Sequence, residues 1–204
     1  MMAESGLLRV GLTGGIATGK SYCLAKFAEL GAATIDADAL ARQAVAPGTA
    51  GFEAVRSRFG AAVLTPEGGL ERNALGRLVF ANADARRALE AIIHPTVYAA
   101  IDRWFASLAN NGHATIAIAD IPLLYETGHE ADFDVVVVTT CSPDQQIDRL
   151  MSRSGLTREA ALQRIAAQMP LEAKVARANY SIDTSGTFEH TDHQVKEIWV
   201  RLAR

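Results

Sequence analysis

The chain has 204 residues, of which 49% are hydrophobic and 21% charged, and its formal net charge at pH 7 is −3. This length and composition are typical of one globular domain, and the small net charge gives no basic field that would attract nucleic acid or an acidic membrane. The two cysteines, Cys23 and Cys141, form no CxxC pair, so the sequence predicts neither a disulfide framework nor a zinc site. No secretory signal and no membrane-spanning apolar run is evident, and we expect a cytoplasmic protein.

The strongest motif lies near the N-terminus. Residues 7–13 are mostly apolar and predict a buried strand, and residues 14–21 match the phosphate-binding pattern G-x-x-x-x-G-K-[ST]. Helical spacing follows Ser21, as the motif requires. The glycines allow backbone N–H groups to surround a phosphate chain, Lys20 would reach the β- and γ-phosphates, and the Ser21 hydroxyl would ligate Mg²⁺. The sequence therefore predicts binding of ATP with Mg²⁺.

A long helical segment follows the second predicted strand, at 33–35. Helices are expected at 39–45, 49–60, 72–80 and 83–93, with a turn or short hairpin at 61–70. His94-Pro95 is expected to interrupt the helical pattern, with Pro95 in the first turn of a new helix that stops at residues 110–112. Because 36–112 is far longer than an ordinary crossover between strands, we interpret it as a subdomain that covers a substrate.

The remainder of the chain alternates strands and helices. Strands are expected at 114–121, 134–140 and 180–183, and a capping box with proline at its first helical position begins a helix at Ser142. Further helices are expected from Thr157, from Pro170 and over the C-terminus. This alternation predicts an α/β fold with a parallel sheet covered on both faces.

Three acidic residues lie where predicted strands end. Of Asp36 and Asp38, we expect one to cap the following helix and the other to orient an acceptor hydroxyl and take its proton; the residues alone leave open which does which. Asp120 is placed to support Mg²⁺ through water, or to serve as an ordinary turn residue.

Basic residues are concentrated in 142–178. Arg149 and Arg153 lie four apart on one helix face, where they could close over ATP phosphates, whereas Arg158 and Arg164 are expected to solvate exposed faces. His94 could hydrogen-bond a substrate or simply cap the interrupted helices.

Several segments together resemble the dephospho-CoA kinase family, and the resemblance runs essentially end to end. The segments are Gly11-Leu-Thr-Gly-Gly-Ile-Ala-Thr-Gly-Lys-Ser21, Ile35-Asp-Ala-Asp38 with Arg42, 72–80, Ile93-His-Pro95, Ile121-Pro-Leu-Leu-Tyr-Glu126, 146–153 and 165–170. The resemblance implies transfer of the ATP γ-phosphoryl to the ribose 3′-hydroxyl of dephospho-CoA, the last step of coenzyme A biosynthesis. It implies a P-loop fold of the nucleoside-monophosphate-kinase type, a three-layer sandwich with a five-stranded parallel sheet. The expected parts of this single domain are a core (7–35, 113–141 and 179–204), a helical CoA-binding subdomain (36–112) and a lid (142–178).

The resemblance also implies roles for individual residues. Asp38 becomes the expected catalytic carboxylate, with Lys20 and Arg149 as the other catalytic residues. Mg²⁺ is expected at Ser21 and, through water, at Asp120. No obligate protein partner, nucleic acid or membrane is implied. Nucleotide binding is expected from Gly14, Gly15, Ile16, Ala17, Thr18, Gly19, Lys20, Ser21, Tyr22, Arg149 and Arg153, and substrate binding from Asp36, Asp38, Arg72 and His94.

Three positions depart from the family pattern. Ala17 stands where glycine is common, which costs some backbone freedom, and alanine is expected to fit there if its φ is negative. Tyr22 replaces a small hydroxyl residue, which removes one contact to the α-phosphate. Thr184 replaces an asparagine, which puts in doubt a side-chain contact near the adenine.

Two other classes of function are open to a P-loop chain. Shikimate kinase also places an Asp-x-Asp after its second strand, but the long helical insertion and Pro-Leu-Leu-Tyr-Glu speak against it. A GTPase-like switch would need Asn-Lys-x-Asp to recognise guanine, and the sequence has no such string.

Overall fold

The computed structural model describes residues 6–112 and 115–204. The chain divides into two compact units, one formed by Met1–Ile35 with Phe105–Arg204 and the other by Asp36–Trp104. The second unit falls within the range expected for the helical insertion. Residues 142–178, expected to form a lid, belong to the same compact unit as the sheet.

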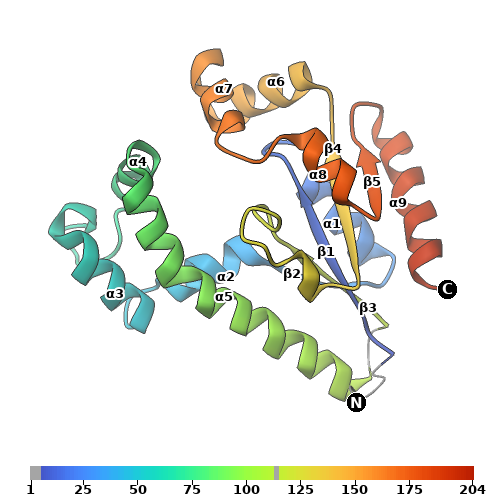
Figure 1. Cartoon of the computed structure of the whole chain (residues 1–204), viewed down its shortest axis with the longest axis horizontal. Helices are drawn as coiled ribbons and strands as arrows, with labels where there is room; N and C mark the ends of the chain where they lie inside the picture. The colour runs from blue at the N-terminus through green and yellow to red at the C-terminus, as the bar shows by residue number, and fades with distance from the viewer. Residues whose placement is uncertain (1–5, 113–114) are drawn as a thin grey trace. The chain divides into compact units, whose positions relative to one another are not determined.

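A five-stranded sheet is the centre of the first unit, in the order β2-β3-β1-β4-β5 (Figure 1). β1 pairs in parallel with β3 and β4, and β4 pairs in parallel with β5. The predicted α/β class and its five strands are confirmed, although Ala114, placed in the expected third strand, lies outside the described residues. Because β1 is central, Gly14 lies at the middle of the carboxyl edge, where open α/β sheets bind ligands. The strands are β1 (Leu8–Gly14), β2 (Ala33–Asp36), β3 (Ile116–Asp120), β4 (Val135–Thr140) and β5 (Tyr180–Asp183).

Helices and loops cover both faces of this sheet. On one face, α1 and α9 pack against side chains of β1 and its neighbours, with Leu12, Phe27 and Ile198 in one buried cluster. The other face meets the segment that follows β3, where Leu124 and Phe133 approach Gly11 so closely that a Cβ there would lie 2.9 Å from Leu124 Cδ2. The expected three layers are therefore present. The helices of this unit are α1 (Lys20–Glu29), α6 (Pro143–Ser154), α7 (Arg158–Ala166), α8 (Leu171–Arg177) and α9 (Phe188–Leu202), with a 3₁₀ turn η2 (Glu130–Asp132).

The second unit is helical and has its own apolar core. Val45, Val55, Val63 and Leu75 are buried together. An isolated antiparallel bridge between residues 64 and 70 confirms the short hairpin expected at 61–70. The elements are α2 (Ala37–Ala44), α3 (Ala50–Phe59), the 3₁₀ turn η1 (Gly60–Val63), α4 (Arg72–Ala81) and α5 (Ala83–Asn111), whose last residues belong to the first unit.

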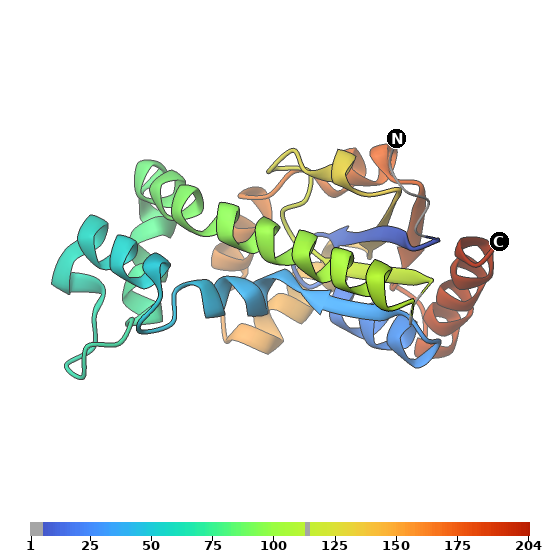
Figure 2. The same ribbon diagram turned by 90° about the horizontal axis from the view of Figure 1, so that it is seen from below.

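The expected interruption at His94-Pro95 is wrong. α5 is one helix of 29 residues with Pro95 inside it (Figure 2). Proline removes one helical hydrogen bond, the one that residue 95 would donate to the carbonyl of Ala91. Ala91 and Pro95 are both exposed, so water can satisfy the carbonyl that this bond would have used. Despite the length of α5, no helix in the described part of the chain is apolar enough over a sufficient length to cross a membrane.

The thiol of Cys23 lies in the core beneath α1, with none of its surface exposed. Burial raises the pKa of this thiol from 9.0 to about 12, so folding favours its neutral form. Below pH 9 the thiol is neutral in both the folded and the unfolded chain, and its contribution to stability is fully present. Between pH 9 and about 12 only the unfolded chain ionises it, so the free energy of unfolding falls by about 1.4 kcal/mol for each pH unit. We expect Cys23 to resist thiol reagents in the native protein at pH 8 and to react on unfolding. The free energy of unfolding is measured above pH 9 for the wild type and for Cys23→Ala, and the wild type should lose more of it as pH rises. The same pH dependence in both proteins would contradict the raised pKa of Cys23.

Candidate active site

The phosphate loop connects β1 to α1 and contains the eight motif positions from Gly14 to Ser21. Gly19 adopts the left-handed conformation, φ 85°, and caps the N-terminus of α1, so Lys20 is the first residue of the helix. The N-terminus of a helix presents unpaired N–H groups and partial positive charge, which favours an anion at this place. Lys20 is half-buried and Ser21 is exposed, so the two side chains that the motif assigns to phosphate and metal are accessible.

Side chains from β4 and α6 restrict the loop from outside. A Cβ on Gly14 would lie 2.4 Å from Thr139 Oγ1 and 2.6 Å from the Thr139 carbonyl oxygen, so only glycine fits there, and a Cβ on Gly15 would lie 2.6 Å from Gln146 Nε2 and displace that side chain. The Thr18 hydroxyl is 2.8 Å from Thr139 Oγ1 and donates to the carbonyl of Gly15 at 2.8 Å. The loop is therefore closely packed.

Ala17 contradicts the expectation of a negative φ. Its φ is 62°, and within residues 6–112 and 115–204 it is the only non-glycine residue with a positive value. The Cβ of alanine meets the following carbonyl in this region, at a cost of about 1–2 kcal/mol. The positive φ of Ala17 belongs to a tight turn of the loop, after which Thr18 bonds back to the carbonyl of Gly15 next to the end of β1.

We expect Ala17→Gly to raise the free energy of unfolding by about 0.5–1 kcal/mol, because glycine adopts this conformation without steric cost but loses more freedom on folding. Chemical denaturation measures the change. Ala25→Gly is the matched control, since Ala25 is exposed within α1 and the same replacement there should lower stability by about 1 kcal/mol. Destabilisation by both variants would contradict the interpretation of strain at Ala17.

Arg149 is held beside the loop by the residue that follows β5. Its guanidinium donates to Thr184 Oγ1 at 2.8 Å and to the Thr184 carbonyl at 2.6 Å, and Thr184 Oγ1 donates to the carbonyl of Thr18 at 3.1 Å. Of the capping box predicted at the start of α6, the N-cap is present, with Ser142 Oγ accepting from the Gln145 N–H, but the return bond is not, because the Ser142 N–H donates to Ser185 Oγ. The Thr184 hydroxyl therefore accepts a hydrogen bond from Arg149 and donates one to the phosphate loop. The threonine that departs from the family pattern thus connects Arg149 to the loop.

A cavity of about 420 Å³ opens beside Gly19, Arg149 and Thr184. Tyr22 and Phe188 contribute aromatic rings to its wall, with centroids 4.9 Å apart. The Tyr22 hydroxyl donates to Asp192 Oδ1 at 2.7 Å. The aromatic wall suits a flat ring system more than a phosphate. Arg153 is exposed in the last turn of α6.

Oxygen donors near the loop suit a magnesium ion. Asp120 ends β3, is 6% exposed and pairs in register with Leu12 of β1, two residues before Gly14. A hydroxyl and a carboxylate are hard oxygen ligands of the kind that Mg²⁺ prefers, and Mg²⁺ usually keeps several waters and phosphate oxygens. Within residues 6–112 and 115–204, no group of three or more His, Cys, Asp or Glu side chains is placed to hold a metal ion.

The structure of the second unit assigns different roles to Asp36 and Asp38, which the sequence could not distinguish. Asp36 is the N-cap of α2 and accepts the Asp38 N–H at 2.8 Å, and it pairs with Arg42 at 3.6 Å. Asp38, in the first turn, is exposed. The capping role expected of one member therefore falls to Asp36.

A cavity of about 290 Å³ in this unit brings Asp38 together with Arg42 and Arg72 above apolar residues of α4 and α5. Two guanidinium groups and a carboxylate on an apolar floor can bind a ligand that carries both phosphate and hydroxyl groups. His94 lies in α5 with its ring 6.3 Å from that of Tyr98, edge to face. Because α5 is continuous, His94 does not cap a helix end.

Comparison with known proteins agrees with this geometry. A family model described as dephospho-CoA kinase matches residues 8–190, most of the chain. The dephospho-CoA kinase of Anaeromyxobacter dehalogenans is 51% identical over 180 residues, which are 88% of this chain and 85% of that protein. The chain belongs to the dephospho-CoA kinase family.

Solved structures show the same fold. TT1252 from Thermus thermophilus is 33% identical with a TM-score of 0.82, over 96% of this chain and 98% of that one. The dephospho-CoA kinase from Campylobacter jejuni is 27% identical with a TM-score of 0.70, over 95% of this chain and 96% of that one. The family confirms the predicted P-loop kinase fold and a kinase that takes ATP as phosphoryl donor, and it does not favour shikimate kinase or a nucleotide switch.

In this member of the dephospho-CoA kinase family, a buried lysine contacts the phosphate loop, and the sequence does not predict it. Lys174 is wholly buried; its Nζ lies 2.8 Å from Glu126 Oε1 and donates to the carbonyls of Pro122 at 3.1 Å and Gly14 at 3.4 Å. Burial lowers the pKa of Lys174, and the hydrogen bond to Glu126 opposes that shift. In the sequence Lys174 is one of six basic residues in 142–178, and nothing in the spacing marks it as buried.

Proposed function

We propose that this protein transfers the γ-phosphoryl group of Mg-ATP to the ribose 3′-hydroxyl of dephospho-CoA, giving coenzyme A and ADP. The observation that supports this most strongly is a phosphate loop at the middle of the carboxyl edge of the sheet, in a chain whose family match covers residues 8–190. The cytoplasmic location, and the absence of nucleic-acid, membrane and obligate protein partners, stay predictions from the sequence.

In the proposed nucleotide site, the phosphates lie against the phosphate loop and the N-terminus of α1, and they bind loop N–H groups other than those of Ile16 and Thr18, which donate to Gln168 and to the Gly15 carbonyl. Lys20 offsets charge on the β- and γ-phosphates, and Arg149 and Arg153 approach from α6. The adenine would lie against Tyr22 in the aromatic cavity. Ser21, with Asp120 acting through water, would hold Mg²⁺, which supplies charge neutralisation at the phosphates when bound.

In the proposed acceptor site, Asp38 orients the 3′-hydroxyl and takes its proton as the oxygen bonds to the γ-phosphorus. The bond from that phosphorus to the β–γ bridging oxygen breaks, and ADP leaves with the electron pair. Arg72 would bind phosphate groups of dephospho-CoA, and His94 would donate or accept a hydrogen bond to the substrate. Asp36 acts through α2, whose first turn carries Asp38.

The test is a direct assay of purified protein with Mg-ATP and separate acceptors, namely dephospho-CoA, shikimate and water alone. ADP release and product mass are followed together, and Lys20→Ala is the inactive reference, expected to lose at least about 10³ in rate. Phosphorylated dephospho-CoA as the product supports the proposal. Turnover of shikimate with none of dephospho-CoA, or ADP release without any phosphorylated product, would overturn it.

A further inference from the structure

Two glutamines that the proposed mechanism does not use bind the same residue of the phosphate loop. Gln146, on α6, donates from Nε2 to the Ile16 carbonyl at 2.8 Å. Gln168, between α7 and α8, accepts the Ile16 N–H through Oε1 at 2.7 Å. Both hydrogen-bonding groups of Ile16 are thus occupied by side chains from the 142–178 region.

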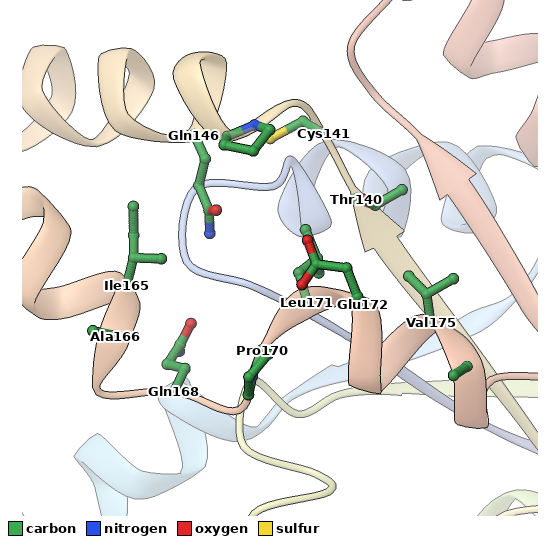
Figure 3. Close-up of a pocket in the computed structure, with 12 residues that line it drawn as sticks. Thr140, Cys141, Gln146, Ile165, Ala166, Gln168, Pro170, Leu171, Glu172 and Val175 are labelled. Carbon is green, nitrogen blue, oxygen red and sulfur yellow. The ribbon is translucent and has the colours of Figure 1, made fainter.

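These two side chains enter one cavity from opposite sides (Figure 3). The cavity measures about 810 Å³, and Ile165, Leu171 and Val175 contribute apolar surface to it. Gln146 is itself only 5% exposed. Gln168 is half-buried, so both hydrogen bonds are partly shielded from water and hold geometry more firmly than the same bonds on an open surface.

The residue after Ile16 is the strained Ala17. A residue with a Cβ does not keep φ at 62° unless its neighbours enforce it. On one side Thr18 is fixed by Thr139 and by the carbonyl of Gly15. On the other side Ile16 is fixed by the two glutamines. We propose that Gln146 and Gln168 are positioning residues that hold the phosphate loop in its nucleotide-binding shape by fixing both polar groups of Ile16, and with them the left-handed conformation of Ala17.

The arrangement also links the loop to the arginine of the site. Gln146 and Arg149 are three residues apart and so share one face of α6. Gln146 contacts the loop at Ile16, and Arg149 contacts it through Thr184, which binds the carbonyl of Thr18. One helix therefore sets the position of the loop and of the cationic side chain that is proposed to approach the same phosphates.

The different roles of the two amides permit a charge-matched test. Gln168→Glu keeps an acceptor for the Ile16 N–H, whereas Gln146→Glu replaces a donor with a carboxylate facing the Ile16 carbonyl. Both add one negative charge of nearly the same size and shape. Gln163→Glu, at an exposed position of α7, controls for added charge elsewhere in this region.

This inference rests on the proposed binding of ATP, so the readout is the dissociation constant for Mg-ADP, measured by titration calorimetry without any acceptor. We expect Gln146→Glu to weaken binding about tenfold, and Gln168→Glu and Gln163→Glu to change it by less than about threefold. Gln168→Met, which removes the acceptor, should also weaken binding about tenfold. Melting temperatures are measured in parallel, and loss of affinity in folded protein separates positioning from general destabilisation.

A second test of the inference uses the strained residue, Ala17. In an Ala17→Gly background the loop reaches the left-handed conformation without steric cost, so the effect of Gln146→Glu should fall from about tenfold to about threefold or less. Equal effects of Gln146→Glu and Gln168→Glu, or an undiminished effect with Gly at position 17, would overturn the inference while leaving the proposed function standing. A wild-type protein that binds no Mg-ADP would overturn both.

Discussion

Replacing Asp38 with asparagine is expected to lower kcat for dephospho-CoA phosphorylation by about 10²–10⁴, because the amide cannot take the proton of the acceptor hydroxyl. The affinity for ATP should change little, since Asp38 belongs to the second unit and the phosphate loop to the first. Steady-state kinetics with ATP and dephospho-CoA varied in turn measure kcat and both KM values. Collapse of ATP binding with normal turnover at saturation would show that Asp38 binds or caps and does not act as a base.

Asp36→Asn is the matched control, two residues away and with the same chemical change. Asparagine is as good an N-cap as aspartate, so α2 should keep its first turn and stability should change by only a few tenths of a kcal/mol. We expect this variant to retain most of kcat. If Asp36→Asn were the inactive variant and Asp38→Asn the active one, the assignment of base and cap would be reversed.

The second large effect is expected at Lys174. Lys174→Met removes the cation of this ion pair, so the Glu126 carboxylate and the carbonyls of Gly14 and Pro122 each lose one hydrogen-bond donor. Loss of one partner of a buried pair typically costs about 3–5 kcal/mol of folding free energy. Since Glu126 retains the Met169 N–H as a donor and is 22% exposed, we expect a loss near 3 kcal/mol, measured by chemical denaturation.

A surface ion pair of the same region provides the comparison. Arg158 lies 3.4 Å from Asp144, and its side chain is 57% exposed. Exposed pairs contribute about 0–1 kcal/mol, so Arg158→Met should change stability far less than Lys174→Met. If both variants lost a similar amount of unfolding free energy, burial would not make the ion pair of Lys174 more important for stability than an exposed pair.

The fold could be predicted because its signals are local. Apolar runs gave all five strands, and glycines and side-chain caps such as Ser142 and Thr157 gave most helix ends. The exception is Pro95, where a general rule about proline in helices predicted two helices. The structure shows one helix: Pro95 is exposed, while residues before it (Ile92) and after it (Ile101) are packed against other apolar residues or buried, which stabilises the helix on both sides of the missing hydrogen bond.

The candidate site could be predicted only in part. The motif located Lys20 and Ser21, since its chemistry requires those residue types at that spacing. The two bonds to Ile16, beside the strained Ala17, come from residues 130 and 152 positions away, and Lys174 is bound by residues that are 52 and 160 positions away, so one sequence carries no record of these pairings. The roles of Asp36 and Asp38 could not be told apart for a different reason: capping depends on the residue at which the helix begins, and the sequence does not fix that residue.

The packing of the phosphate loop has a thermodynamic consequence. Thr18 is bound to Thr139, Thr184 and Gly15, and Ile16 is bound through both its N–H and its carbonyl, in each case by groups of the protein itself. Ordering a flexible loop costs about 1–2 kcal/mol per residue in conformational entropy. Here that cost is met during folding, so nucleotide affinity is not reduced by it. The loop is preorganised for its ligand, at the expense of a strained residue in the folded chain.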